Sequence, residues 1–176
     1  MNISLIGYRG TGKSVVGKIV SERLRMKCIG MDARIIEKAG MSIPEIVENK
    51  GWSAFRDMES EVVRELAELD NIIIDTGGGV IERPENIKTL KASSYIIWLK
   101  ASTNTIVSRI QGDTERPSLT GEKSFTEEVE EVLERRTPIY ESAAQYDIDT
   151  EQLTPEQVAD RIIEIWNKAN NLNVRT

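Results

Sequence analysis

The segment Gly7–Ser14 carries residues whose types and spacing could bind a nucleoside triphosphate. Its sequence, GYRGTGKS, fits the pattern G-x-x-x-x-G-K-S between an apolar stretch and an amphipathic segment, as a phosphate-binding loop requires. Glycines let successive backbone N–H groups turn toward the β-phosphate, and the N-terminus of the following helix adds a partial positive charge. Lys13 adds a point charge, and the Ser14 hydroxyl can bind a magnesium ion that bridges the β- and γ-phosphoryl oxygens. A glycine-rich turn with a chance lysine is the alternative, and the placement favours nucleotide binding.

ATP contacts are expected from the second half of this segment and from the residue that follows it. The expected contacts are Gly10, Thr11, Gly12, Lys13, Ser14 and Val15. A phosphate-binding loop alone does not separate kinases from GTPases, motor ATPases or nucleotide sensors. The sequence contains no guanine-reading Asn-Lys-x-Asp, and 176 residues are too few for the extra elements of most motor ATPases. Residues downstream must therefore decide the reaction.

Three glycines, Gly77–Gly79, form a second segment that is suited to a ligand. They follow the apolar run Ile72–Ile74, and ligands bind at the carboxyl ends of strands in open α/β sheets. Because these residues have no side chains, a small substrate could approach the backbone closely. A tight turn without a ligand is the alternative.

The elements that must position these residues alternate along the chain. Short, β-branched apolar runs occur at residues 3–6, 28–29, 72–74, 95–99 and 148, and longer amphipathic segments separate them. This alternation predicts a parallel sheet covered by helices. No repeat, low-complexity tract or linker divides the chain, so residues 1–176 are predicted to form one domain.

Two helix starts and one loop are marked by their local sequence. The capping box Thr154–Gln157, with Pro155 in its first turn, predicts the start of the last helix. A second capping box, Ser124–Glu127, opens a helix that should end before Pro138. The polar stretch at about residues 112–124 has no apolar period and is predicted to be a mobile loop.

Together these motifs resemble those of the shikimate kinase family over nearly the whole chain. The resemblance is carried by Gly7–Ser14, Asp32, Phe55-Arg56 with Glu59, Gly77–Gly79, Arg116-Pro117 and Arg135–Tyr140. It implies a three-layer α/β/α fold like that of P-loop nucleoside-monophosphate kinases, with a five-stranded parallel sheet and the mobile loop as a lid. It also implies ATP-dependent phosphorylation of shikimate at its 3-hydroxyl, with Mg²⁺ as cofactor. A related kinase of gluconate or a nucleotide, and an ATP-binding regulatory homologue with weakened catalysis, are the alternatives.

The resemblance assigns Arg56 and Arg136 to the substrate's carboxylate, with Gly77–Gly79 and Asp32 completing the substrate site. Guanidinium groups suit this role because their N–H groups match the two oxygens of a carboxylate. Each arginine also has an alternative explanation. Arg56 could pair with Glu59 three residues along a helix, and Arg136 could be favoured by the dipole at a helix end.

Lys13, Asp32 and Arg116 are the catalytic residues that the resemblance implies. Asp32 would accept a hydrogen bond from the reacting hydroxyl, as an orienting group or as a base, and an ordinary helix N-cap is its alternative role. Arg116 would swing over the cleft, contact ATP and place positive charge on the transferring phosphoryl group. Arg109 and Pro155 are expected to flank the adenine, although Pro155 is also a good helix starter.

The chain departs from the family pattern after its second predicted strand. Family members usually carry Asp-x-Asp there, whereas this chain has Gly30-Met31-Asp32 and lacks the first carboxylate, which helps to hold magnesium. Asp75 follows an apolar run, where many phosphate-loop enzymes place an acidic residue for magnesium. We therefore expect Ser14 and Asp75 to hold the metal. A turn aspartate that bonds the local backbone is the alternative for Asp75.

Composition and charge limit the partners. The chain has 23 Lys and Arg against 29 Asp and Glu, a formal net charge of −6, so no overall positive field exists to hold nucleic acid or an anionic membrane. The apolar run at the N-terminus is too short for a signal or transmembrane segment. The single cysteine, Cys28, is predicted to be a buried, reduced thiol. We expect a cytoplasmic monomer whose partners are ATP and shikimate, with no nucleic acid and no membrane.

Overall fold

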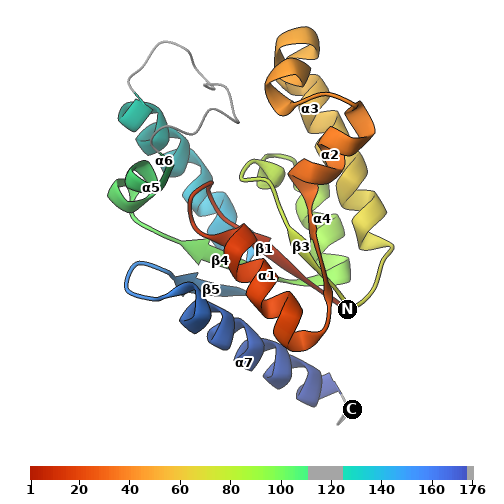
Figure 1. Ribbon diagram of the computed structural model, residues 1–176, viewed down its shortest axis with the longest axis vertical. Helices are drawn as coiled ribbons and strands as arrows, with labels where there is room; N and C mark the ends of the chain where they lie inside the picture. Colours follow the sequence, from red (N-terminus) through yellow and green to blue (C-terminus); the bar gives the residue numbers. More distant parts are fainter. Residues whose placement is uncertain (111–124, 174–176) are drawn as a thin grey trace.

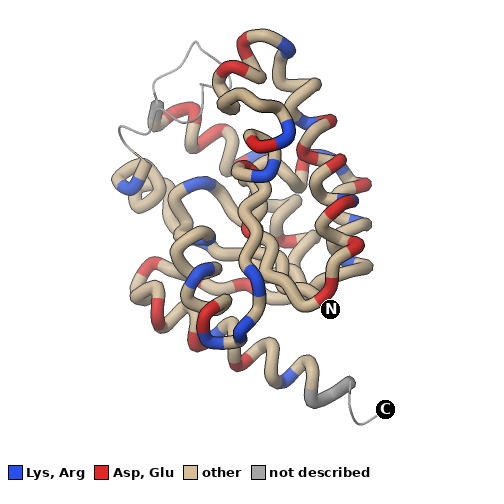
Figure 2. The backbone as a smooth tube through the Cα atoms, turned by 45° about the vertical axis from the view of Figure 1, so that its right-hand side comes forward, with Lys and Arg blue, Asp and Glu red and all other residues tan. Residues whose placement is uncertain are grey.

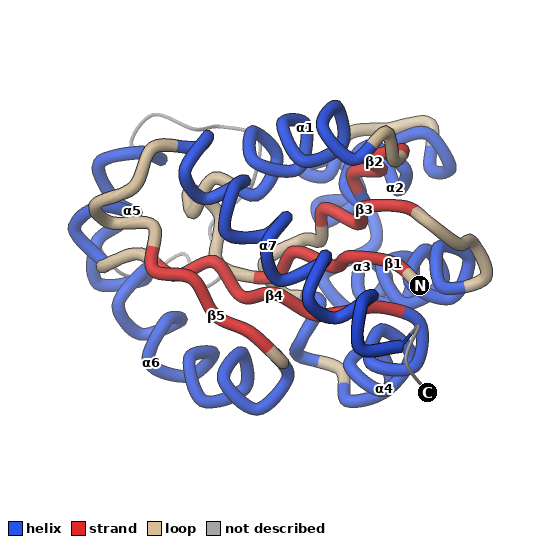
Figure 3. Tube along the Cα trace, turned by 90° about the horizontal axis from the view of Figure 1, so that it is seen from below, coloured by secondary structure: helices blue, strands red, loops and turns tan. Residues whose placement is uncertain are grey.

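Five strands form one parallel sheet in the order β2-β3-β1-β4-β5 (Figure 3). The strands are β1 (Asn2–Ile6), β2 (Lys27–Gly30), β3 (Ile72–Asp75), β4 (Ser94–Lys100) and β5 (Tyr146–Asp149), at the places predicted from the apolar runs. The computed structural model describes residues 1–110 and 125–173, with side chains described for 1–110 and 126–170. Because every strand pair is parallel, the carboxyl ends of all five strands lie at the same edge of the sheet.

Helices cover both faces of the sheet, which confirms the predicted three-layer fold. α1 (Lys13–Leu24) and α7 (Pro155–Asn173) pack on one face, and α3 (Ile43–Ala67), α4 (Pro84–Ser93) and α6 (Phe125–Ala143) pack on the other (Figure 3). Successive residues of a strand point to opposite faces, so strands with apolar residues at every position supply both cores.

The remaining elements lie near the carboxyl ends of the strands and flank the loop after β1. They are α2 (Met31–Ala39), which leads into α3, α5 (Thr103–Ile110), which packs against α6, and the 3-10 turn η1 (Val80–Glu82) between β3 and α4. Figure 1 shows α2 and α3 on one side of this loop and α5 and α6 on the other. Gly51 interrupts α3 with φ 80° and ψ 167°, a conformation that glycine tolerates.

Of the local sequence signals, the start of α7 was predicted correctly and the end of α6 was predicted wrongly. The Gln157 N–H donates to Thr154 Oγ1 at 3.3 Å and the Thr154 N–H donates to Gln157 Oε1 at 2.9 Å, so this capping box is confirmed. The predicted end before Pro138 is wrong, because α6 continues through Pro138 to Ala143. Tyr140 and Ala143 are buried in the core, and this packing offsets the hydrogen bond that proline cannot donate.

Three of the predicted features lie outside the described residues: the lid at about residues 112–124, Arg116, and Ser124 as a helix cap. Within residues 1–110 and 125–173, no helix is both long enough and apolar enough to cross a membrane. Figure 2 shows acidic and basic residues interspersed along the helices.

Cys28 is half-buried, so it is less buried than the sequence predicted. It packs beside α1, where a β-carbon at Gly17 would lie 3.1 Å from the Cys28 sulfur. Burial, with a further contribution from the charge of Asp75 and an opposing one from Lys18, raises the pKa of the Cys28 thiol from 9.0 to about 11. The thiol is therefore protonated near neutral pH.

We expect Cys28 in the folded protein to react slowly with a thiol-specific disulfide reagent, because the thiolate is the reactive form. The rate should keep rising with pH toward about 11 in the folded protein, whereas in the urea-unfolded chain it should level off near 9.0. Initial rates over a pH series measure this difference, with the unfolded chain as the control. An equal pH dependence in the two states would contradict the raised pKa.

Candidate active site

The loop between β1 and α1 has the backbone of a phosphate cradle. Gly10 and Gly12 have φ values of 83° and 91°, in the left-handed region that glycine favours. Gly7 approaches β4 so closely that a β-carbon there would lie 2.5 Å from the Leu99 carbonyl oxygen. The N-terminus of α1 follows this loop directly, so its partial positive charge adds to the attraction for phosphate.

The Lys13 side chain is buried inside this loop. The residue is 7% exposed, and its Nζ donates to the carbonyl oxygens of Gly7 at 2.8 Å and Tyr8 at 3.0 Å. The Thr11 hydroxyl donates to the same Tyr8 carbonyl oxygen at 2.8 Å. The ammonium group is therefore positioned at the loop, where phosphate oxygens could take the place of the carbonyl oxygens.

Ser14 and Asp75, the predicted metal-binding residues, are in direct contact. The Ser14 hydroxyl donates to Asp75 Oδ2 at 2.5 Å, a contact between α1 and the end of β3. Asp75 ends β3 and is in register with Gly30, which ends β2. Residues in register on parallel neighbours point to the same face, so the Asp75 carboxylate lies beside the position of the family's first aspartate.

A cavity of about 290 Å³ joins the phosphate loop to Asp32. Its walls are formed by Arg9, Gly10, Gly12, Lys13, Ser14, Val15, Asp32, Thr76, Gly77 and Gly78. The cavity thus brings together the predicted ATP-binding loop, the predicted partner of the reacting hydroxyl and two of the three glycines. Thr76 lies outside the sequence motifs, and Arg9, which lies inside the Gly7–Ser14 motif, was not among the expected ATP contacts.

Asp32 is not a helix cap, so that alternative is wrong. The N-cap of α2 is Gly30, and Asp32 lies in the first turn of the helix. The helix dipole favours a carboxylate at this place. Because Asp32 lines the cavity that Lys13 and Ser14 also line, its position is compatible with the predicted contact to an acceptor hydroxyl.

The three glycines bring the backbone after β3 against two other segments. A β-carbon at Gly78 would lie 3.4 Å from the Gly7 carbonyl oxygen, and one at Gly79 only 2.2 Å from Arg56 Nη2. The buried Tyr140 donates its hydroxyl to the Gly78 carbonyl oxygen. The guanidinium group of Arg56 therefore lies directly on the Gly79 backbone, and a side chain at position 79 would have to displace it.

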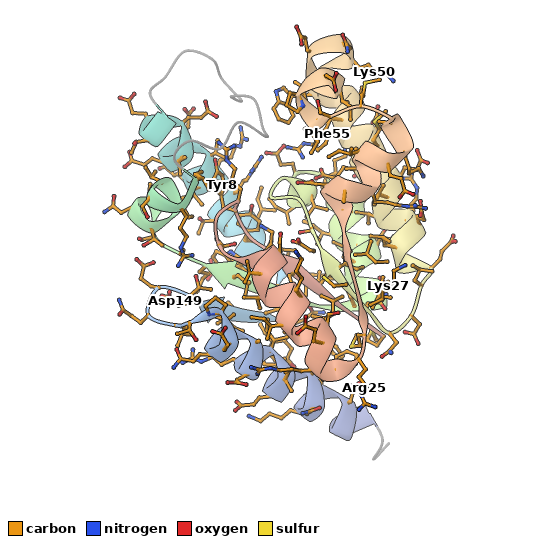
Figure 4. The ribbon with its side chains drawn as sticks, in the orientation of Figure 1. Tyr8, Arg25, Lys27, Lys50, Phe55 and Asp149 are labelled. Carbon is orange, nitrogen blue, oxygen red and sulfur yellow. The ribbon has the colours of Figure 1, made fainter. Side chains whose placement is uncertain are left out.

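Arg56 is buried where α3 meets these glycines. Its side chain is 9% exposed, and its guanidinium carbon lies 5.6 Å from the Trp52 ring centroid and 5.3 Å from that of Phe55, which Figure 4 labels on α3. Arg56 Nη1 donates to Glu59 Oε2 at 2.7 Å, so the alternative pairing along the helix exists. Arg56 nevertheless also lines a second cavity, of about 250 Å³, and so can contribute to a binding site.

Arg136 lies near Arg56, and Glu82 links the two. The Arg136 side chain is 5% exposed and lies within α6 rather than at its end, so the helix-dipole explanation is wrong. Its Nε and Nη2 donate to Glu82 Oε1 at 2.9 and 2.7 Å, while Arg56 Nε lies 3.4 Å from Glu82 Oε2. Arg136 also lies 5.8 Å from the ring centroid of Tyr8, the residue whose carbonyl oxygen accepts from Lys13. The arginines thus face the same region as the phosphate loop, where Figure 4 labels Tyr8.

The ionisation of this cluster follows from its charges. Burial raises the pKa of the Glu82 carboxyl, but the guanidinium groups of Arg136, Arg56 and Arg135 outweigh burial and hold this pKa below its usual value. Burial raises the pKa of the Tyr140 hydroxyl, which keeps its proton to donate to Gly78. The cluster therefore holds an ionised carboxylate at neutral pH.

Arg109 and Pro155, predicted to flank adenine, lie on α5 and α7. Glu151, shortly before α7, forms a hydrogen bond to the start of α5. Arg109 Nη1, at the end of α5, donates to the Gly10 carbonyl oxygen at 3.0 Å. Pro155 is the exposed first residue of α7, as its role of helix starter requires. Glu151 accepts from the N–H of Ser102, just before α5, at 3.0 Å. The adenine contacts stay a prediction.

Glu82 was not predicted from the sequence. Its partner Arg136 is 54 positions away, so no local spacing indicates the pair. One signal could have found it: a buried arginine needs an anionic partner, and Glu82 is three residues after the last of the predicted substrate glycines.

The arrangement can hold two anions, a polyphosphate at the loop and a carboxylate at the arginines, and Asp32 lines the cavity at the loop. In the described part of the chain, no group of three or more His, Cys, Asp or Glu side chains could hold a metal ion. One hydroxyl and one carboxylate nevertheless suit Mg²⁺, which keeps several waters and binds substrate phosphates. Ser14 and Asp75 therefore fit a magnesium ion that arrives with the nucleotide.

Comparisons with known proteins agree with this arrangement. The protein-family model for shikimate kinase matches residues 9–167. A curated shikimate kinase from Thermodesulfovibrio yellowstonii is 44% identical over 171 residues, which is 97% of each chain. A solved structure of the shikimate kinase from Acinetobacter baumannii in complex with shikimate has a TM-score of 0.91 at 31% identity and covers 96% of this chain and 93% of that one. The structure of shikimate kinase from Aquifex aeolicus has a TM-score of 0.83 at 31% identity, with 98% and 99% covered.

Proposed function

Because the chain belongs to the shikimate kinase family, we propose that it transfers the γ-phosphoryl group of ATP to the 3-hydroxyl of shikimate. The observation that carries this proposal is the cavity that Lys13, Ser14 and Asp32 line together. Gly78 lines the same cavity, and its neighbour Gly79 contacts Arg56, so the carboxylate-binding arginines adjoin the site of phosphoryl transfer.

In the proposed reaction, the acceptor hydroxyl oxygen forms a bond to the γ-phosphorus. The bond from that phosphorus to the β–γ bridging oxygen breaks, and ADP leaves. Asp32 orients the hydroxyl by accepting its hydrogen bond and takes its proton late in the transfer, because little proton transfer is needed early in a loose transition state. Lys13 and the N–H groups of the loop stabilise the charge on the phosphoryl oxygens. Arg56 and Arg136 hold the substrate's carboxylate, which fixes the hydroxyl for in-line attack.

The remaining assignments rest on the family resemblance. We propose that residues 1–176 act as one domain and as a monomer in the cytoplasm. Arg109 and Pro155 would flank adenine, and Arg116, in a lid at about residues 112–124, would contact the transferring phosphoryl group.

We propose Ser14 and Asp75 as the magnesium-binding residues, supported by their hydrogen bond and by the register of Asp75 with Gly30. Bound Mg²⁺ would neutralise charge on the β- and γ-phosphoryl oxygens. We expect Asp75→Ala to raise the Mg²⁺ concentration for half-maximal rate by about tenfold or more. Steady-state rates across a Mg²⁺ series measure this change.

Gly30 offers a rescue of that variant. A β-carbon at Gly30 would have no heavy atom within 4 Å, and its φ of −81° and ψ of 123° suit any residue. Gly30→Asp in the Asp75→Ala background should therefore lower the Mg²⁺ requirement again. Asp147→Ala, on β5, is the matched control and should leave it unchanged. A Mg²⁺ requirement that Asp75→Ala does not alter would remove Asp75 from the metal site.

Coupled ADP release with and without shikimate tests the proposed function. We expect release that depends on shikimate and saturates with it, and no comparable release with gluconate or a nucleoside monophosphate. A preference for either of those acceptors would favour the related-kinase alternative. ATP binding without shikimate-dependent ADP release would favour a regulatory homologue and overturn the proposal.

A further inference from the structure

Glu82 places a carboxylate of the protein where two buried arginines converge. Its Oε1 accepts from Arg136 Nε at 2.9 Å, from Arg136 Nη2 at 2.7 Å and from Arg135 Nη2 at 2.9 Å. Its Oε2 lies 3.4 Å from Arg56 Nε. The Nε and Nη2 edge of a guanidinium group is an edge that a substrate carboxylate could also use. Glu82 therefore occupies donors that the proposed function assigns to the substrate.

Each of the two buried arginines already has a carboxylate partner within the protein. Arg56 pairs with Glu59, whose side chain is fully buried, and Arg136 pairs with Glu82. Two buried guanidinium groups without anions would be costly, because desolvated charges need partners. Glu82 thus stabilises the buried Arg136, and an incoming carboxylate meets two arginines that already have anionic partners.

The Glu82 side chain is exposed enough to move away from Arg136. Its side chain is 27% exposed, against 5% for Arg136, and it lies at the end of the three-residue turn η1. Arg135, whose side chain is 62% exposed, also donates to Glu82 Oε1. A carboxylate that leaves Arg136 can therefore keep one ion pair.

We propose that Glu82 is a displaceable internal carboxylate, which occupies the Nε and Nη2 donors of Arg136 and which the substrate's carboxylate must replace. This inference rests on the proposed function, because it takes Arg56 and Arg136 as the carboxylate site. Glu82 is a specificity residue that sets the affinity for anionic substrates below what the arginines alone would give.

Glu82→Gln tests this inference, because it removes the charge and keeps the side-chain length. We expect the Kd for shikimate, measured by calorimetry without nucleotide, to fall about tenfold, as the loss of one charged competitor allows. The KM for shikimate should fall in parallel, with kcat changing much less. The uncharged methyl ester of shikimate should bind wild type and variant equally, because it cannot use the freed charge.

Glu65→Gln is the matched control. Glu65 is 32% exposed and accepts from Arg34 and Lys38 on α2, so the substitution removes the same charge from a comparable ion-pair cluster. It should leave the Kd for shikimate unchanged. A Kd of Glu82→Gln that equals or exceeds that of wild type would overturn the inference and assign Glu82 a positioning role.

Arg135→Gln gives an independent test on an exposed residue that does not endanger folding. Without Arg135, a displaced Glu82 has no arginine left to pair with, whereas an undisplaced Glu82 keeps Arg136 and Arg56, so the Kd for shikimate should rise severalfold. The same substitution should have a much smaller effect in the Glu82→Gln background, and equal effects in both backgrounds would contradict displacement. If the wild-type protein neither binds shikimate nor releases ADP in its presence, the proposed function fails together with this inference. If the wild-type protein is active and the variants do not behave as expected, only the inference about Glu82 fails.

Discussion

Replacing Lys13 with methionine is expected to lower kcat by about a thousandfold, because this is the scale on which a single charged group stabilises a transition state in a water-poor site. The ammonium group is buried in the loop and is held by the Gly7 and Tyr8 carbonyl oxygens, so it needs no rearrangement of the backbone to meet a phosphate. Shikimate-dependent ADP release at saturating substrates measures the loss. Methionine keeps the length of the side chain and removes only its charge and its hydrogen bonds.

Lys18→Met is the control for Lys13, since Lys18 is exposed on the same helix and the net charge changes equally. It should retain the wild-type rate. A Lys13→Met variant with a rate within about tenfold of wild type would show that the lysine does not act on the transferring group.

The second large effect is expected for Asp32→Asn, which should lower kcat by about a hundredfold or more. Asparagine can still accept a hydrogen bond from the hydroxyl, but it carries no charge and cannot take the proton as the phosphoryl group leaves ATP. The KM for shikimate should change far less than kcat, because Arg56 and Arg136 hold the carboxylate elsewhere in the site.

Asp160→Asn, on the exposed side of α7, removes an equal charge from the opposite face of the sheet and should have no effect on kcat. Thermal unfolding of both variants controls for stability. If Asp32→Asn raised KM and left kcat unchanged, Asp32 would be a binding residue without a role in the transfer step.

The sheet and the phosphate loop were predictable because their signals are local. Residues 3–6, 72–74 and 95–99 are each apolar at nearly every position, as strands buried on both faces must be. The loop Gly7–Ser14 needs backbone N–H groups and one helix N-terminus, all supplied within eight consecutive residues. The prediction that this helix ends before Pro138 was wrong, because the burial of Tyr140 in the core outweighs the local tendency of proline to end a helix.

The carboxylate-binding end of the site was predictable only in part. Arg56 and Arg136 were found through the family resemblance, and local rules offered ordinary explanations for both. Their burial, and the contact of Arg56 with the Gly79 backbone, depend on how α3, α6 and η1 pack together. Glu82 could not be found from spacing at all, because its contact with Arg136 exists only once η1 lies against α6.

The pairing of β2 with β3 has a consequence for how proteins of this kind are compared. Positions 30 and 75 are neighbours across two hydrogen-bonded strands, so either one can deliver an acidic group to the same point beside Ser14. The family pattern marks only the acid that position 30 lacks. An acidic group at position 30 and the one at position 75 would lie at a single place in space, although they belong to two separate stretches of the sequence.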